Sequence, residues 1–187
     1  MKEKNTVVKK PEEAFNFQKD NSYLQKEIID IITIMQDSLK IAIAGATGYV
    51  GLELVKILSR HPKVKITYLC AQKSIGKSIY QIDRNIKKKH LPKISKISSI
   101  NFKNIDIIFS ALPNGAAHKL AKKLQNKTKL IDLSADFRIY NPKIYKKWYG
   151  INHNGKNLIK KSIYAIAEFS KEKIKNYKII SCPGCYP

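Results

Sequence analysis

From residue 39 onward, short runs of uninterrupted apolar residues alternate with segments in which apolar residues recur at helical spacing. Strands are expected at residues 39–44 (LKIAIA), 64–70 (VKITYLC), 105–112 (IDIIFSAL) and 129–134 (KLIDLS). Helices are expected between Gly48 and Pro62 and over residues 116–124. Strands without alternation that are separated by helices are typical of a parallel sheet covered on both faces. The pattern therefore predicts an α/β fold with a Rossmann-like, doubly wound parallel sheet.

The pattern changes on both sides of this block. Residues 1–38 are polar up to Asp20 and then carry apolar residues at helical spacing in SYLQKEIIDIITIMQ, which predicts one appended amphipathic helix. Residues 73–104 are weakly patterned and are expected to be loop with short strands. After Arg138, a short helix is expected from near Pro142 to Gly150. SIYAIAEFS (162–170) and YKIIS (177–181) then look like strands of something new.

These changes divide the chain into three parts. Residues 1–38 are an N-terminal extension, residues 39–150 are the Rossmann-like domain, and residues 151–187 are expected to begin a second, α+β domain. No run of about 18 apolar residues occurs, so no membrane span is expected. The start of the chain lacks the features of a signal peptide, and three cysteines do not make a disulfide scaffold. The cytoplasm is the expected location.

The formal net charge of +22 comes almost wholly from lysine, because only three of the 36 basic residues are arginine. A nucleic-acid-binding protein would be expected to use more arginine, which pairs with phosphate and guanine through two hydrogen bonds at once. The densest cluster, KKKH at Lys87, has no interleaved aromatic residues. Nucleic acid is therefore not the expected partner, whereas a basic surface does favour anionic small molecules.

The first expected strand runs directly into GATGYVG, a glycine-rich turn that opens the first helix. A strand, a tight glycine turn and a helix N-terminus together make a site for a dinucleotide pyrophosphate. Gly45 would allow the turn, Gly48 the close approach of the ligand, and Gly51 the packing of helix on strand. The residues expected to contact the cofactor here are Gly45, Ala46, Thr47, Gly48, Tyr49, Val50 and Gly51. The alternative is a tight turn without a ligand.

The end of the second strand indicates which dinucleotide is bound. NAD sites usually carry Asp or Glu there to bind the ribose 2′-hydroxyl. No acidic residue occurs between Tyr68 and Ser78, where Gln72 and Lys73 stand instead. These residues suit a 2′-phosphate, so NADP(H) is the expected cofactor. The absence of an acid is the stronger argument, because lysine is common throughout the chain.

SCPGCYP, residues 181–187, allows three interpretations. A zinc half-site needs a second Cys or His pair, but Cys70 is the only other cysteine and the four histidines are isolated in sequence, so no metal is expected. A redox dithiol would use Cys182 with Cys185, although dithiol domains of the thioredoxin type do not begin with a GATGYVG turn. The third interpretation is a single nucleophilic thiolate at Cys185, after a strand and a Pro-Gly turn where a helix N-terminus would lower its pKa.

Several separated motifs in the right order resemble N-acetyl-gamma-glutamyl-phosphate reductase. They are GATGYVGLELVKIL from Gly45, ALPNG from Ala111, LIDLSADFR from Leu130, YKKWYG from Tyr145 and PGCYP from Pro183. The resemblance implies that a cysteine attacks an acyl phosphate and expels phosphate, and that NADPH reduces the thioester to an aldehyde. It implies further that Cys185 is the nucleophile and that Leu112 and Pro113 line the cofactor. Ser134 and Arg138 are placed at the substrate, with Arg138 as an anion clamp or, alternatively, in a structural salt bridge. His153 is expected to be structural.

The chain also departs from that family. Cys182 stands where the family commonly has Asn, and residues 1–38 are additional. The sequence stops two residues after Cys185, so it is expected to be a fragment with little turnover, cut from an enzyme that is a homo-oligomer at full length. The general acid/base would lie beyond residue 187. The alternatives are a related aminoadipyl-phosphate or aspartyl-phosphate reductase, a C-x-x-C redox module and a lysine-rich nucleic-acid binder.

Overall fold

The computed structural model describes residues 38–86, 90–125 and 127–184. Residues from Ser38 onward belong to one compact unit. The amphipathic helix expected before residue 38 lies outside the described residues, and so does Cys185. Within the described ranges, no helix has the length and apolar character needed to cross a bilayer.

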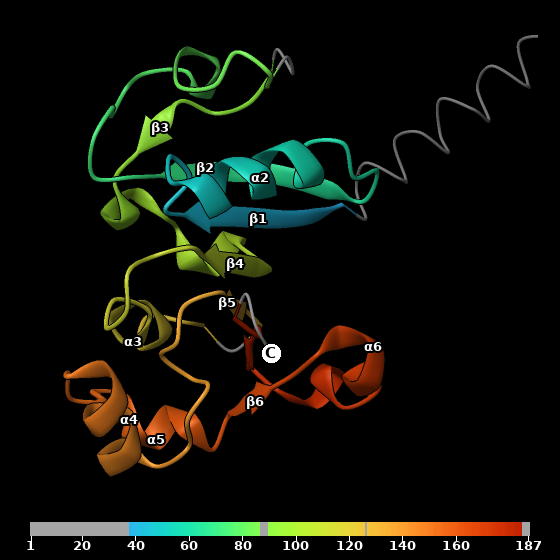
Figure 1. Cartoon of the computed structure of the whole chain (residues 1–187). Coiled ribbons are helices and arrows are strands. Elements are labelled where there is room, and N and C mark those ends of the chain that lie inside the picture. The colour runs from blue at the N-terminus through green and yellow to red at the C-terminus, as the bar shows by residue number, and fades with distance from the viewer. Residues whose placement is uncertain (1–37, 87–89, 126, 185–187) are drawn as a thin grey trace, which may run out of the picture. The chain divides into compact units, whose positions relative to one another are not determined.

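The described residues build a seven-stranded parallel sheet with the order β3-β2-β1-β4-β5-β7-β6 (Figure 1). The strands are β1 (Leu39–Ala44), β2 (Val64–Cys70), β3 (Ile94–Ser95), β4 (Ile107–Ser110), β5 (Lys129–Asp132), β6 (Ser162–Tyr164) and β7 (Ile179–Ser181). The strand order reverses direction at β1, as in doubly wound sheets. This confirms the Rossmann-like fold class that the apolar runs predicted.

Both faces of the sheet are buried, as the continuous apolar runs require. Ile41 and Ile43 of β1 pack with Val55 of helix α2 (Tyr49–Leu58) in one core cluster. The alternate residues Ala42 and Ala44 belong to a second cluster, which includes Leu120 of helix α3 (Ala117–Ala121) and Ile179 of β7. Each face of the sheet therefore has its own helix layer, and the edge where the strands end is left for loops.

Shorter elements connect these layers. They are the 3₁₀ turns η1 (Ile79–Gln81), η2 (Ile97–Ser99), η3 (Phe102–Asn104) and η4 (Ile174–Asn176), and the helices α4 (Pro142–Tyr149), α5 (Lys156–Ile159) and α6 (Ala167–Ser170). Helix α4 agrees with the expected one. The Asn141 side chain accepts hydrogen bonds from two first-turn N–H groups, Pro142 takes the first helical position, and Gly150 ends the helix in the left-handed conformation.

The C-terminal strands differ from what the sequence suggested. β6 and β7 do not begin something new, because β7 pairs with β5, and β6 with β7, in the first sheet. Only 162–164 of the segment SIYAIAEFS is strand, and α6 follows it. The boundary placed between residues 150 and 151 stays a prediction.

Candidate functional site

Four neighbouring parallel strands end on one line across the sheet. Ala44, Ser110, Asp132 and Ser181 are successive partners in the register of β1, β4, β5 and β7. The segments that follow these strands carry GATGYVG, ALPNG, SADFR and SCPG. In open parallel sheets, ligands bind at this carboxyl edge, beside the point where the strand order reverses. The fold thus gathers motifs that are far apart in the sequence at one edge.

The glycine turn has the shape that the sequence predicted. Gly45 has a φ of 89°, and a Cβ there would overlap the backbone of Ala111. A Cβ at Gly51 would overlap the backbone of Gly45, whereas one at Gly48 would meet only a single atom, at 3.5 Å. The first and third glycines are therefore required by packing, whereas the second would accept a methyl group without overlap.

The N-terminus of α2 is free to accept an anion. Gly48 is its N-cap, without a side-chain capping bond, and the first turn has no acidic residue. Such a helix start presents N–H groups that lack intrahelical partners, together with the positive end of the helix dipole. Gly48, Tyr49 and Val50 are exposed, with Tyr49 at 94% exposure, so these residues are accessible to a ligand. Thr47 is half-buried and Ala46 is buried.

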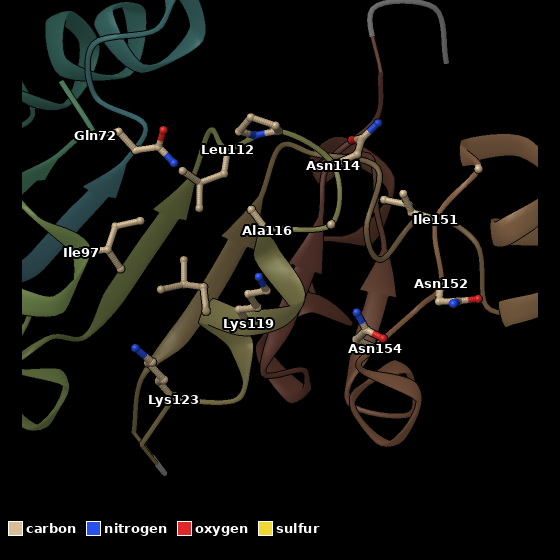
Figure 2. Close-up of a pocket in the computed structure, with 14 residues that line it drawn as sticks. Gln72, Ile97, Leu112, Asn114, Ala116, Lys119, Lys123, Ile151, Asn152 and Asn154 are labelled. Atoms are coloured by element: carbon tan, nitrogen blue, oxygen red, sulfur yellow. The ribbon is translucent and has the colours of Figure 1, made fainter.

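A pocket of about 880 Å³ opens beside helix α3. It is lined by Gln72, Leu112 and Pro113, three of the residues predicted to contact the cofactor, but not by Lys73 or the glycine turn. Figure 2 shows Lys119 between Gln72 and Ile97 on one side and Ile151, Asn152 and Asn154 on the other, with Lys123 below Ile97. Among the residues that the structure describes, no acidic one lines the pocket. Two lysines and several amides make it suited to an anionic, hydrogen-bonding ligand.

Several residues that line this pocket together with Leu112 and Pro113 were not predicted from the sequence. Asn114, Lys119 and Asn152 line it but had no signal of their own, since lysine and asparagine are common throughout the chain. The signal available was position: Asn114 follows a strand that ends at the carboxyl edge. Its side chain accepts a hydrogen bond from the Ala135 N–H at 3.0 Å, which joins the loops after β4 and β5.

Asp136, in the middle of SADFR, holds the start of α3 and was not singled out from the sequence. Its buried carboxylate accepts hydrogen bonds from the N–H groups of Gly115 at 2.6 Å, Ala117 at 2.9 Å and His118 at 3.3 Å. It also accepts from the hydroxyl of Tyr145 at 2.8 Å. One carboxylate therefore caps α3, whose own N-cap is an alanine, and ties it to α4.

Two histidines that are far apart in sequence meet beside Asp136. The rings of His118 and His153 lie 4.0 Å apart between centroids, and the Nε2 of each lies near the Asp136 carbonyl oxygen, at 3.3 and 2.7 Å. Burial and the neighbouring His118 lower the pKa of His153. A buried neutral imidazole bonded to the backbone matches the structural role expected for His153.

A second buried carboxylate, Asp132, ends β5. Ser134 donates to it through its N–H at 3.1 Å and its Oγ at 2.9 Å. Burial raises the pKa of Asp132 to about 6, and these hydrogen bonds oppose the rise. Ser134, predicted to bind substrate, is itself buried, and its hydroxyl is engaged with Asp132. Its role toward substrate stays a prediction.

Arg138 lies at the segment that leads to Cys185. Its Nε donates to the Cys182 carbonyl at 2.9 Å, and its Nη2 donates to the carbonyls of Leu133 at 2.9 Å and Pro183 at 3.3 Å. In the part of the chain that the structure describes, no carboxylate pairs with Arg138, so the structural salt bridge considered as its alternative role is absent there. The Cys182 N–H donates to the Asp132 carbonyl at 2.8 Å.

The Cys182 thiol does not have the character of a redox cysteine. It is half-buried, and burial together with the nearby Asp132 raises its pKa, while Arg138 opposes that effect. A cysteine of a redox dithiol has a lowered pKa instead. The structure thus uses the backbone of Cys182, on both its N–H and its carbonyl, rather than its thiol.

Comparison with known proteins agrees with this arrangement. A family model described as semialdehyde dehydrogenase, NAD binding domain, matches residues 40–177. Among curated proteins, the chain is 45% identical over 154 residues to N-acetyl-gamma-glutamyl-phosphate reductase of Ehrlichia canis, covering 82% of this chain and 44% of that protein. It is 36% identical over 148 residues to the reductase of that name from Paracoccus denitrificans, covering 79% and 43%.

Solved structures show the fold likeness at lower identity. Aspartate semialdehyde dehydrogenase II from Vibrio cholerae superposes with a TM-score of 0.55 at 17% identity, covering 79% of this chain and 38% of that one. A second structure of that enzyme gives a TM-score of 0.53 at 16% identity, covering 79% and 42%. The chain spans less than half the length of these proteins and of the two reductases.

Proposed function

Because this chain belongs to the semialdehyde dehydrogenase family, through its NAD-binding domain, we propose that it is the cofactor-binding part of an N-acetyl-gamma-glutamyl-phosphate reductase. The observation that carries the proposal is the gathering of four motif-bearing loops at the carboxyl edge of β1, β4, β5 and β7. The identity of 45% to a curated reductase extends over 154 residues, which are 82% of this chain. The family's cofactor is a nicotinamide dinucleotide, and NADP(H) is the form proposed here.

The residues present fit such a cofactor. The exposed Gly48 and the start of α2, which has no side-chain cap, suit a pyrophosphate. Gln72, Leu112 and Pro113 follow the glycine turn in the sequence and line a pocket in which none of the described lining residues is acidic. The absence of an acidic residue between Tyr68 and Ser78 favours a 2′-phosphate over a free 2′-hydroxyl.

In the proposed reaction, the Cys185 thiolate attacks the carbonyl carbon of the acyl phosphate. A C–S bond forms, the bond between carbon and the phosphate oxygen breaks, and inorganic phosphate leaves. A bound NADPH supplies the hydride that reduces the resulting thioester. The C–S bond then breaks, the thiolate is released, and N-acetylglutamate semialdehyde leaves. Ser134 and Arg138 are proposed to bind the substrate, while a homo-oligomer at full length and a cytoplasmic location stay predictions.

The cofactor part of the proposal is tested by calorimetric titration of the 187-residue chain with NADPH and with NADH. We expect tighter binding of NADPH. Gly48→Asp should weaken the binding of both dinucleotides by at least about tenfold, because it places a carboxylate where the pyrophosphate would lie. Asn176→Asp, which adds the same charge at an exposed site in η4, is the control and should bind as the parent does. Equal affinity of the parent and Gly48→Asp would refute the cofactor site.

The reaction itself is tested in a chimera in which residues of the Ehrlichia canis reductase continue the chain after Pro187. NADP⁺ reduction is followed with N-acetylglutamate semialdehyde and phosphate, and with the aspartate and aminoadipate analogues. Preference for the N-acetylglutamyl compound is expected, with activity abolished in Cys185→Ser and retained in Cys182→Ser. Loss of activity in Cys182→Ser would instead support the dithiol interpretation.

A further inference from the structure

We propose that His118 and His153 are positioning residues, which hold helix α3 against residues 150–154 and so keep the shape of the pocket that both segments line. The hold requires neutral imidazoles, so it weakens in acid. Its importance for the cofactor rests on the proposed function, because Leu112 and Pro113 line the same pocket. The contacts that join the two segments do not depend on that function.

The two histidines lie next to residues that line the pocket, but they face the interior of the protein. His118 precedes Lys119 in α3, and its side chain is fully buried. His153 stands between Asn152 and Asn154 and is 2% exposed. The centroids of the two imidazole rings are 4.0 Å apart. The pair therefore joins α3 to residues 150–154 on the buried side of the pocket (Figure 2).

One backbone carbonyl group contacts both rings. The Nε2 atoms of His118 and His153 lie 3.3 and 2.7 Å from the carbonyl oxygen of Asp136. This oxygen can accept from both rings only where each Nε2 carries a hydrogen. The Nδ1 of His153 in turn accepts a hydrogen bond from the Gly155 N–H at 3.3 Å. These contacts assign His153 to the neutral tautomer with its hydrogen on Nε2.

Neither ring has a place for a second proton. On His153, a hydrogen at Nδ1 would face the Gly155 N–H, so that two donors would oppose each other. The Nδ1 of His118 is buried and has no hydrogen-bond partner among the residues that the structure describes, so an N–H there would be unsatisfied. The rings of Phe137 and Tyr145 enclose the pair, at 5.1 to 5.6 Å from both imidazoles.

The Asp136 carboxylate is close to the pair but already has its partners. Its Oδ2 lies 3.8 Å from Nε2 of His118, while the carboxylate accepts three backbone N–H bonds and the Tyr145 hydroxyl. Burial, and then the neighbouring His118, lower the pKa of His153, and Asp136 opposes this effect. A neutral pair is therefore the stable form in the fold.

The other titratable groups at the pair do not stabilise a positive imidazole. Burial and the hydrogen bond to Asp136 raise the pKa of Tyr145, whose ring also contacts Tyr149 at 5.0 Å. His153 further lines two shallow pockets together with four cationic residues, which are Lys122, Lys143, Lys146 and Lys156.

Separation of α3 from residues 150–154 would release the imidazoles to water, where their ordinary pKa of about 6.5 applies. The open form then binds protons more readily than the closed form, so opening becomes easier as the pH falls below this value. For each imidazole released, the ratio of open to closed protein should increase about tenfold between pH 7 and pH 5.5.

The experiment measures amide hydrogen exchange of peptides from α3 and from residues 150–158 in the 187-residue chain, as protection relative to the unstructured peptides. We expect this protection to fall at least about tenfold between pH 7 and pH 5.5. His153→Gln keeps a donor for the Asp136 carbonyl but does not titrate, so the fall should be about tenfold smaller. His61→Gln, at an exposed histidine after α2, is the control and should behave as the parent does.

Protection that does not change with pH in the parent, or that changes equally in His153→Gln, would overturn the proposal. If His153→Gln fails to fold, nitrogen-15 NMR of the parent imidazoles decides the question. His153 should then keep the neutral tautomer with its hydrogen on Nε2 down to pH 5.5. Titration of this ring near pH 6.5 would show that the fold does not select the neutral form, and would also overturn the proposal.

The importance for the cofactor has its own measurement. NADP⁺ at about a hundred times its dissociation constant should raise the protection of both peptides about a hundredfold, because it binds only the closed pocket. Binding of NADP⁺ without increased protection would overturn the link between the histidine pair and the cofactor. Absence of binding would refute the cofactor site itself, whereas the pH dependence still decides whether the pair holds the two segments together.

Discussion

At the scale of single residues, the three glycines of GATGYVG differ in what a methyl group would meet. Gly45→Ala and Gly51→Ala each drive a Cβ into backbone, and Gly45 also has a positive φ. We expect each to lower the free energy of unfolding by at least about 2 kcal/mol. Gly48→Ala should stay within about 1 kcal/mol of the parent, because its Cβ would make only an ordinary van der Waals contact, at 3.5 Å.

Urea unfolding of the three variants, followed by circular dichroism, checks this prediction. Gly48→Ala serves as the matched control for the other two, since it adds the same methyl group in the same loop. If Gly48→Ala lowered the free energy of unfolding as much as Gly45→Ala, the middle glycine would be required by packing. The space above it would then be no argument for a ligand.

Asp132 gives a prediction about pH. Its pKa rises from 3.8 to about 6 in the fold, so the folded protein binds an extra proton between these values and is destabilised as pH rises through this window. The shift corresponds to a loss of about 3 kcal/mol in the free energy of unfolding, which is complete above about pH 7. Asp132→Asn should therefore gain stability relative to the parent by up to about 3 kcal/mol between pH 4 and pH 7.

The measurement is urea unfolding of parent and Asp132→Asn at several pH values from 3.5 to 8. Other titrating groups are common to both proteins, so the difference isolates Asp132. Above about pH 7 the difference should be independent of pH, because the carboxyl group is then ionised in both states. If the difference in free energy of unfolding between the two proteins did not change with pH, the pKa of Asp132 would not be raised in the fold.

At the scale of elements, helix α3 depends on a cap from a distant segment. It has five residues, and the Asp136 carboxylate accepts hydrogen bonds from two of its backbone N–H groups, those of Ala117 and His118, and from the N–H of Gly115 just before it. Asp136→Asn turns one acceptor oxygen into a donor inside this buried network. It should lower the free energy of unfolding by about 3 kcal/mol. Tyr145→Phe removes only one partner and should cost about 1 kcal/mol.

Thermal and urea unfolding of both variants test this ranking, with Tyr140→Phe as a tyrosine control outside the network around Asp136. Its hydroxyl accepts from the exposed Tyr164 N–H at 3.1 Å. A smaller effect for Asp136→Asn than for Tyr145→Phe would show that the carboxylate does not hold α3.

The difference between local signals and contacts with distant residues explains which elements could be predicted from the sequence. β1 and β2 were predicted at their observed limits, and α4 at its start and end, because apolar runs, Pro142 and Gly150 act locally. Helix α3 was predicted too long, since after Ala121 the hydrogen bonds pass to the i→i−3 pattern of a 3₁₀ turn. The capping of α3 by Asp136 and the contact of Arg138 with the C-terminal segment depend on partners 18 to 45 residues away, which no local pattern contains.

At the scale of the whole molecule, the boundary expected at residue 150 can be tested by truncation. Removing residues 151–187 would expose the edge of β5, which pairs with β7, and would remove Ile179 from the core cluster around Leu130. The Lys129 Nζ would also lose its carbonyl acceptors at Ile174, Lys175 and Tyr177. An exposed parallel strand edge is unstable and prone to pair with other chains.

We therefore expect residues 1–150 alone to lose cooperative unfolding and to associate, whereas the 187-residue chain unfolds in one transition. Urea unfolding and size-exclusion chromatography of the two proteins make the comparison, and a protein ending at Ser181, after β7, is the control that keeps the sheet. If residues 1–150 fold as a stable monomer with an unchanged midpoint, the boundary at 150 is a true domain limit. If they do not, residues 151–181 complete the domain that holds the glycine turn, and the loop carrying Cys185 leaves from the same sheet as the cofactor site.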